Sequence, residues 1–177
     1  MSAIDPTTAA LPPSPPPPRV ALVVDGAGGP GRIVSTWLAT AGSAVAVTVA
    51  GSGSGRAAFL SKELIDQGHT ALPYCVDLDD PGALRRLIAD IEGDLGPVDL
   101  LVYMVHTVRP VLPPALDQHV VAGLAAAGRP AHVVAVTTAD SALLGTGPVR
   151  VTVIAPAADD QAVAAAVLAV ALLPEDR

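Results

Sequence analysis

Cysteine, lysine and aromatic residues are scarce in this sequence, and the first two shortages exclude whole classes of structure or partner. Cys75 is the single cysteine, so an intramolecular disulfide and a cysteine-based metal cluster are both excluded. Lys62 is the single lysine, and the formal net charge is −7. No basic stripe is present that could neutralise the phosphates of a nucleic acid or an anionic membrane surface. We therefore expect neither a nucleic acid nor a membrane as a partner.

The low aromatic content bears on the core. Aromatic residues make up 2% of the chain and hydrophobic residues 51%, so the core has to be packed mainly by Ala, Val and Leu. Such a core gains less free energy per buried residue than one with Phe or Trp anchors. We expect modest stability for the isolated chain and a dependence on a partner subunit. The composition is typical of a GC-rich bacterial genome.

A secretory signal and a membrane span are missing as well. The N-terminal segment has no charged region followed by an apolar one, and the longest apolar run, residues 162–173, falls short of the roughly 20 residues that cross a bilayer. Residues 1–18 are rich in proline and are predicted to form a disordered tail before a single domain, residues 19–177. We therefore expect a cytoplasmic protein.

Beyond residue 19, apolar runs alternate with helical segments. Strands are predicted at residues 20–24, 44–49, 69–76, 98–105, 131–137 and 149–155, and helices at 32–41, 56–67, 81–95, 113–127 and 159–173. This alternation predicts a doubly wound parallel sheet of about six strands with helices on both faces, a three-layer α/β/α fold. Such sheets bind ligands at the carboxyl ends of their strands, near the point where the strand order reverses.

The most informative segment joins the first predicted strand to the first predicted helix. Gly26, Gly28 and Gly31 have the spacing GxGxxG, in which the first glycine makes a tight turn, the second lets a pyrophosphate approach the backbone, and the third lets the helix pack on the strand. N–H groups at the helix N-terminus would then meet the phosphates. Asp25 stands at the mouth of this loop and would repel a phosphate unless it turns toward the loop backbone. A simple tight turn is the alternative interpretation.

The end of the second predicted strand bears on the choice of dinucleotide. A carboxylate there favours NAD, whereas this chain has Ser52 and, four residues later, Arg56. An arginine without a carboxylate could accommodate a 2′-phosphate, which favours NADP over NAD. The alternative is a flexible loop, residues 51–55, followed by a solvated arginine.

Four further segments make the chain resemble the short-chain dehydrogenase/reductase family. They are residues 75–81 (CVDLDDP), 96–102 (GPVDLLV), 133–138 (VVAVTT) and 149–156 (VRVTVIAP), and their order and spacing fit the family. The resemblance covers residues 19 to about 173. It implies a Rossmann-type fold, NADP or NAD as cofactor, and an adenine pocket lined by Asp77 and Leu78.

The chain departs from that family where catalysis would take place. The family uses a Ser together with a Tyr and a Lys four residues apart on one helix; Thr138 falls at the Ser position, but no Tyr or Lys follows it. Residues 138–148 leave no room for a full helix between the last two strands. Where the family has Asn-Asn-Ala-Gly, this chain has YMVH, residues 103–106. Tyr103 or His106 could act as a new acid–base group, or Tyr103 could be a packing residue and His106 a loop residue.

Three functional hypotheses remain open. The first is a degenerate family member that binds NAD(P) without chemistry of its own and works as a non-catalytic subunit, beside a complete family member or as a homo-oligomer. The second is an active NADPH-dependent reductase with an atypical proton donor, and the third is a scaffold that binds no nucleotide. The first is our preferred interpretation. The four histidines show no metal-ligand spacing, so no metal is expected, and Cys75, at a strand end, is expected to be buried.

Overall fold

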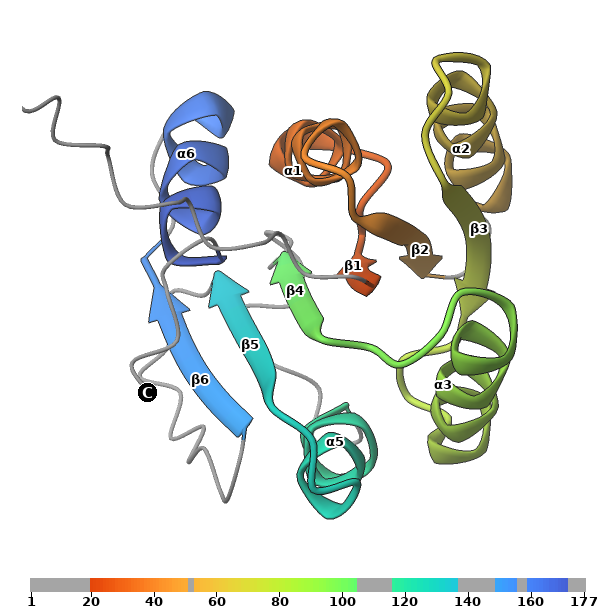
Figure 1. The fold of residues 1–177 in the computed structure, drawn as a ribbon, viewed down its shortest axis with the longest axis vertical. Coiled ribbons are helices and arrows are strands. Elements are labelled where there is room, and N and C mark those ends of the chain that lie inside the picture. The colour runs from red at the N-terminus through yellow and green to blue at the C-terminus, as the bar shows by residue number, and fades with distance from the viewer. Residues whose placement is uncertain (1–19, 51–52, 105–115, 137–148, 156–158, 172–177) are drawn as a thin grey trace, which may run out of the picture.

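The computed structural model describes residues 20–50, 53–104, 116–136, 149–155 and 159–171, whose arrangement is shown in Figure 1. The predicted proline-rich tail lies outside these residues. Strands and helices alternate along the chain in the order β1 (Val20–Val24), α1 (Gly29–Thr40), β2 (Ala44–Ala50), α2 (Ser54–Asp66), β3 (Ala71–Val76), α3 (Pro81–Asp94), β4 (Leu100–Met104), a short π-helical segment η2 (Asp117–Val121), α5 (Ala122–Ala126), β5 (Ala131–Val136), β6 (Val149–Ile154) and α6 (Asp160–Ala171).

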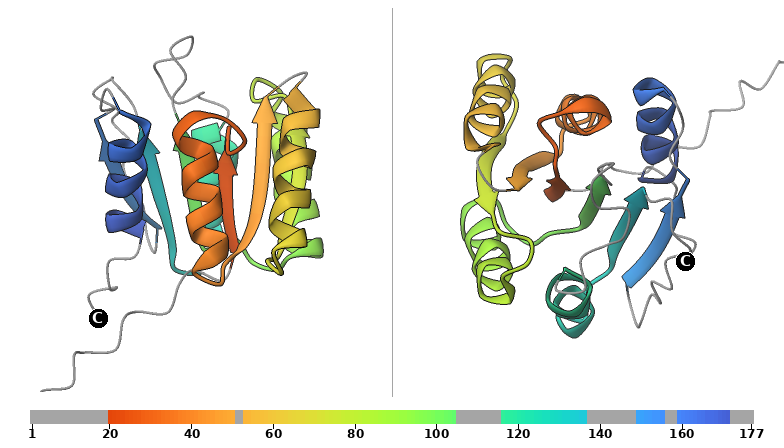
Figure 2. Two further views of the ribbon diagram at one scale, coloured as in Figure 1. Left: turned by 90° about the horizontal axis from the view of Figure 1, so that it is seen from above. Right: turned by 180° about the vertical axis from the view of Figure 1, so that it is seen from behind.

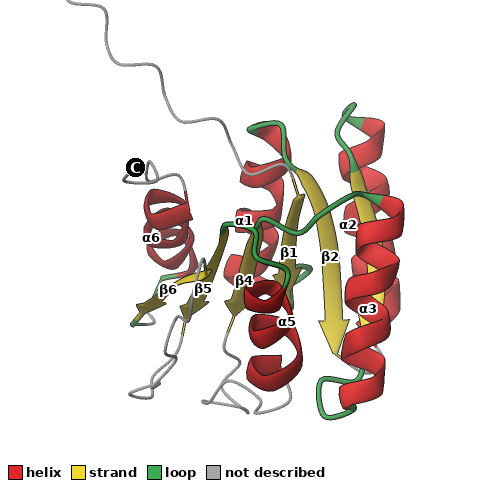
Figure 3. Cartoon of the chain, turned by 60° about the horizontal axis from the view of Figure 1, so that its bottom comes forward, coloured by secondary structure: helices red, strands yellow, loops and turns green. Residues whose placement is uncertain are grey.

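The strands form one parallel sheet in the order β3-β2-β1-β4-β5-β6. The chain builds outward from β1 to β3, returns past β1 to β4, and builds outward again on the other side. In Figure 3 the strands accordingly all point the same way. The strand order reverses between β1 and β4, where a sheet of this kind leaves a crevice at the carboxyl ends of its strands. The predicted doubly wound, Rossmann-type α/β fold is confirmed.

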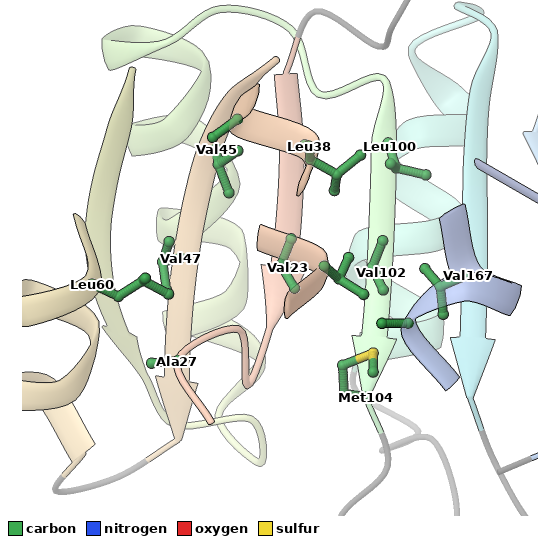
Figure 4. Packing of buried hydrophobic residues seen from close by; sticks show 14 of the residues in the cluster. Val23, Ala27, Leu38, Val45, Val47, Leu60, Leu100, Val102, Met104 and Val167 are labelled. Carbon is green, nitrogen blue, oxygen red and sulfur yellow. The ribbon is translucent and has the colours of Figure 1, made fainter. Parts of the chain in front are cut away.

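Helices cover both faces of the sheet. α1, α2 and α6 lie side by side on one face, and α3 and α5 lie on the other (Figures 1 and 2). On the first face, Leu38 of α1 and Leu60 of α2 pack in one buried cluster with Val23, Val47 and Val102 of the sheet (Figure 4). A second buried cluster fills the opposite face beneath α3 and α5. The two clusters make the sheet the middle layer of three.

Burial along the strands follows their place in the sheet. Every residue of β1 and β4 is buried, as expected for central strands covered on both faces. In the outer strands β3 and β6, buried residues stand only at strand ends, and the other residues are partly or fully exposed. β3 contains Pro73, a residue that sheets tolerate at their edges because it cannot donate a ladder hydrogen bond. Cys75 also lies on β3 and is exposed, so the expectation of a buried thiol was wrong.

The core is aliphatic, as the composition requires. Of the four aromatic residues in the sequence, Tyr103 alone is fully buried, whereas Trp37 and Phe59 are 56% and 65% exposed. Val, Leu and Ala supply almost all of the buried apolar side chains. The aromatic residues therefore contribute little to the packing between the layers.

Several element boundaries differ from those predicted. α1 begins at Gly29 rather than at residue 32, because Pro30 suits the first turn of a helix, where its missing N–H is not needed. α2 begins at Ser54, so the glycine-rich loop before it is shorter than expected. β3 begins at Ala71, because the backbone N–H of His69 bonds instead to the carbonyl of Leu64 and closes α2. The predicted helix at 113–127 is described only from residue 116 and includes the π-helical segment.

Candidate functional site

The turn between β1 and α1 lies at the carboxyl end of the central strand, beside the point where the strand order reverses (Figure 1). Three hydrogen bonds hold this turn. Two are donated by buried side chains, and one joins the backbone of the turn to a neighbouring strand. The backbone N–H of Gly26 donates to the carbonyl of Thr48 on β2 (3.0 Å), and Ser35 Oγ of α1 donates to the carbonyl of Gly26 (3.0 Å). Thr48 Oγ1 donates to the carbonyl of Val23 (3.1 Å). The turn is therefore fixed to β2 below it and to α1 beside it.

Two of the three motif glycines are required by packing alone. A methyl group on Gly26 would lie 2.8 Å from Ser35 Oγ and 2.9 Å from the carbonyl oxygen of Val23, too close for real contacts. A methyl group on Gly31 would overlap the carbonyl oxygen of Asp25. Both glycines have the roles expected of them, the tight turn and the close packing of helix on strand.

Gly28 is different, because nothing within the described chain requires a glycine there. Its backbone is extended (φ −132°, ψ 157°), and a methyl group on it would lie 3.6 Å from Arg56 Nη1, an ordinary contact. Neither conformation nor packing requires glycine here, and apart from Arg56 the backbone of Gly28 is left uncovered among the described residues. A close approach of a ligand to the backbone is one physical reason for a glycine at this position.

The N-terminus of α1 lacks a capping side chain. Gly28 is the N-cap residue and contributes no side-chain hydrogen bond, and the first turn holds no acidic residue. In α3, by contrast, the N-cap residue Asp80 accepts a hydrogen bond from the N–H of Gly82 (2.7 Å). Backbone N–H groups and the positive end of the helix dipole make an uncapped N-terminus suitable for a phosphate.

Charged side chains flank the turn on two sides. Arg56, on α2, is exposed, and its Nη2 lies 3.4 Å from the position of a methyl group on Gly53, close to the contact with Gly28 described above. On the other side, Asp160 of α6 places Oδ2 3.4 Å from the position of a methyl group on Gly29. Asp25 itself has a positive φ of 59°, which Asp adopts more readily than most residues. The turn thus has a cation on its β2 side and a carboxylate on its α6 side.

The structure places Asp77 and Leu78 just after β3, at the same edge of the sheet. Asp77 Oδ1 accepts a hydrogen bond from the N–H of Asp79 (3.0 Å), so this carboxylate shapes the turn into α3. Leu78 is buried in the cluster on the α3 face. Their predicted contact with an adenine ring stays a prediction.

Of the candidate catalytic residues, Tyr103 alone lies within the described part of the chain. Tyr103 is 3% exposed and packs in the cluster on the α3 and α5 face, which fits the packing interpretation. Lys62 lies on α2, on the opposite face of the sheet, and pairs with Asp66 (2.6 Å). Ser52, His106 and Thr138 lie outside the described residues.

Two further expectations concern metals and membranes. Within the described residues, no group of His, Cys, Asp and Glu side chains could hold a metal ion. None of the helices described is long and apolar enough to cross a bilayer. His132 of β5 contacts the neighbouring edge strand β6, with Nε2 2.9 Å from Thr152 Oγ1. Burial, together with the nearby Arg150, lowers the pKa of His132 below its usual value.

Comparisons with known proteins agree with this geometry. A family model described as short chain dehydrogenase matches residues 19–112, more than half of the chain. The protein belongs to the short-chain dehydrogenase family. A short chain dehydrogenase of Pseudocercospora fijiensis is 33% identical over 100 residues, covering 56% of this chain and 31% of that protein. The (2S)-[(R)-hydroxy(phenyl)methyl]succinyl-CoA dehydrogenase subunit BbsC of Thauera aromatica is 31% identical over 106 residues, covering 60% and 42%. The chain thus spans less than half the length of either relative.

A solved structure shows the same fold over most of the chain. It is a metagenomic short-chain oxidoreductase in complex with NADP, with a TM-score of 0.66, 20% identity, and coverage of 88% of this chain and 91% of that one. At this level of identity the likeness concerns the fold.

Sequence reasoning missed Asp160 as part of the site. The sequence predicts residues 159 and 160 only as the start of the last helix, and no local pattern connects them with the turn at Gly29. Their proximity depends on the packing of α6 beside α1.

Proposed function

We propose that this protein is a dinucleotide-binding member of its family that lacks a proton relay of its own and works as a non-catalytic or partner-dependent subunit of a reductase system. The observation that carries the proposal is the β1–α1 turn, in which Gly28 leaves the backbone bare beside an uncapped helix N-terminus. The N–H groups of this first turn would hold the pyrophosphate. A bound nicotinamide would supply hydride-transfer chemistry, and the chain's own residues would bind and orient it.

The arginine beside the turn favours NADP over NAD. Arg56 forms no ion pair among the described residues, whereas Arg32 of α1 pairs with Glu63 of α2 (2.7 Å). A guanidinium that is exposed and close to Gly28 and Gly53 could make a bidentate contact with a 2′-phosphate. No carboxylate follows β2 directly in the sequence to compete for that arginine or to accept a ribose hydroxyl.

The absence of a Tyr–Lys pair supports a role without independent chemistry. In the family such a lysine lowers the pKa of the tyrosine so that it can pass a proton to the substrate oxygen. Here both tyrosines, Tyr74 and Tyr103, pack toward the α3 face, while Lys62 stands on the α2 face. Tyr74 donates its hydroxyl to Asp94 (3.0 Å), and burial together with that carboxylate raises its pKa, which opposes a role as the proton donor.

A partner subunit could supply the missing groups. One curated relative is itself named as a subunit of a dehydrogenase, which supports a partner-dependent role. A complete family member and a second copy of this chain are both candidate partners. A cytoplasmic location and a bacterial source stay predictions from the sequence.

Titration with NADPH and NADH, followed by turnover measurements, tests the proposal. The purified protein should bind NADPH saturably, more tightly than NADH, and should not oxidise it in the presence of ketone substrates. When the partner reductase is added, turnover should require the presence of both chains. Reduction of ketones by the protein alone would show an active enzyme with an atypical proton donor, and a failure to bind either dinucleotide would show a scaffold without a nucleotide.

A further inference from the structure

Asp160 is the first residue of α6, and its carboxylate points at the phosphate-binding turn. Its Oδ2 lies 3.4 Å, and its Oδ1 and Cγ lie 3.9 Å, from the position of a methyl group on Gly29. Gly29 is the first residue of α1 and has a φ of +47°. The carboxylate of one helix start therefore lies against the backbone of another.

The neighbouring carboxylate, Asp159, has a separate and purely local role. Asp159 Oδ1 accepts a hydrogen bond from the N–H of Gln161 (3.1 Å), and its carbonyl accepts one from the N–H of Val163 (3.1 Å). These bonds close the first turn of α6 without Asp160. The Asp160 carboxylate is thereby left to face α1, between the positive ends of two helix dipoles.

We infer that Asp160 acts as a built-in anion that competes with the ligand's phosphates at the N-terminus of α1 and so sets the affinity of the site. This inference rests on the proposed binding of a dinucleotide. The ligand would meet an attractive guanidinium, Arg56, on the β2 side of the turn and a repulsive carboxylate on the α6 side. Pyrophosphate is the part of the ligand most affected, because its charge must come closest to Gly29.

Charge removal at Asp160 tests the inference, and Asp159 offers a matched control. Asp160→Asn should bind NADPH and inorganic pyrophosphate about tenfold more tightly than the wild-type protein, as expected for losing a like charge beside the phosphates in a largely solvated site. Asp159→Asn removes the same charge one residue away and keeps a capping side chain, so it should change either affinity less than about twofold. The advantage of Asp160→Asn should shrink at high salt, since exposed charges are screened.

The outcomes distinguish this inference from the proposed function. If the wild-type protein binds NADPH and Asp160→Asn binds it no more tightly, or no more tightly than Asp159→Asn, the inference is wrong while the proposed function stands. If Asp160→Asn gains pyrophosphate binding but neither protein binds a dinucleotide, the inference holds and the proposed function fails. If no variant binds either NADPH or pyrophosphate, the inference and the proposed function are both wrong. Thermal melting of the three proteins verifies that each is folded.

Discussion

Replacing Gly28 with alanine separates the binding role of the turn from its structural role. The extended backbone at Gly28 (φ −132°, ψ 157°) is one that alanine adopts without strain. Among the described residues, the one atom within 4 Å of the new methyl group is Arg56 Nη1, at 3.6 Å. We therefore expect the free energy of unfolding of Gly28→Ala to stay within about 0.5 kcal/mol of the wild-type value.

Dinucleotide binding should respond much more strongly. The methyl group would cover the backbone where the pyrophosphate has to approach, and losing one hydrogen bond to a charged group costs about 1.5–3 kcal/mol. This corresponds to an increase of roughly 10- to 150-fold in the dissociation constant for NADPH. Fluorescence titration with NADPH measures the binding, and urea denaturation measures the stability.

Two other glycines provide the controls. Gly31→Ala would force a methyl group into the carbonyl oxygen of Asp25 and should lower stability by about 1–3 kcal/mol. Gly93→Ala lies in α3 with nothing within 4 Å and should raise stability by about 0.5–1 kcal/mol without changing binding. A binding role for Gly28 is contradicted if Gly28→Ala binds NADPH as tightly as the wild-type protein, or if it loses as much stability as Gly31→Ala.

Three further predictions follow from the contacts around the turn and the outer strands. Arg56→Gln should weaken NADPH binding about tenfold and NADH binding much less, because its guanidinium would pair with the 2′-phosphate; equal losses for the two dinucleotides in parallel titrations would contradict this. Thr48→Val removes the buried hydrogen bond to the carbonyl of Val23 and should lower the free energy of unfolding by about 1 kcal/mol, measured in urea. The pKa of His132 is lowered by folding, so its neutral form is favoured in the native state; stability should be complete above the usual pKa near 6.5 and fall as the pH drops through the lower folded pKa. Denaturation curves at a series of pH values should show this fall for the wild-type protein and a weaker one for His132→Gln.

The alternation of elements could be predicted because its signals are local. β1 is a run of five apolar residues, and all five are buried, as a central parallel strand requires. Asp80 followed by proline predicts a helix start, and its side chain caps α3 as expected. The glycine spacing, placed between a strand and a helix, located the turn correctly. In each case the residues that decide the structure are neighbours in the sequence.

The parts that could not be predicted depend on contacts between distant segments. Cys75 is exposed because β3 is an edge strand, and the sequence of β3 does not reveal its place in the sheet. The approach of Asp160 to Gly29 depends on α6 lying beside α1, and that packing joins the two ends of the described chain. Arg56 was predicted near the site, but neither the start of α2 two residues earlier than expected nor the 3.6 Å from Arg56 Nη1 to the position of a methyl group on Gly28 could be read from the local sequence.

The packing around the turn also changes how much the glycine motif says about function. Gly26 and Gly31 are required by contacts with Val23, Ser35 and Asp25, so a protein that binds nothing would need them equally. Gly28 and the uncapped start of α1, which packing does not require, are therefore the features that favour a ligand. The Asp160 carboxylate opposes binding, because it already supplies part of the negative charge that a pyrophosphate would bring to the N-terminus of α1. The net attraction of this site for a pyrophosphate should therefore be weak. A site of this kind would bind its dinucleotide loosely alone and more tightly once a partner, or a substitution, moved or neutralised that carboxylate.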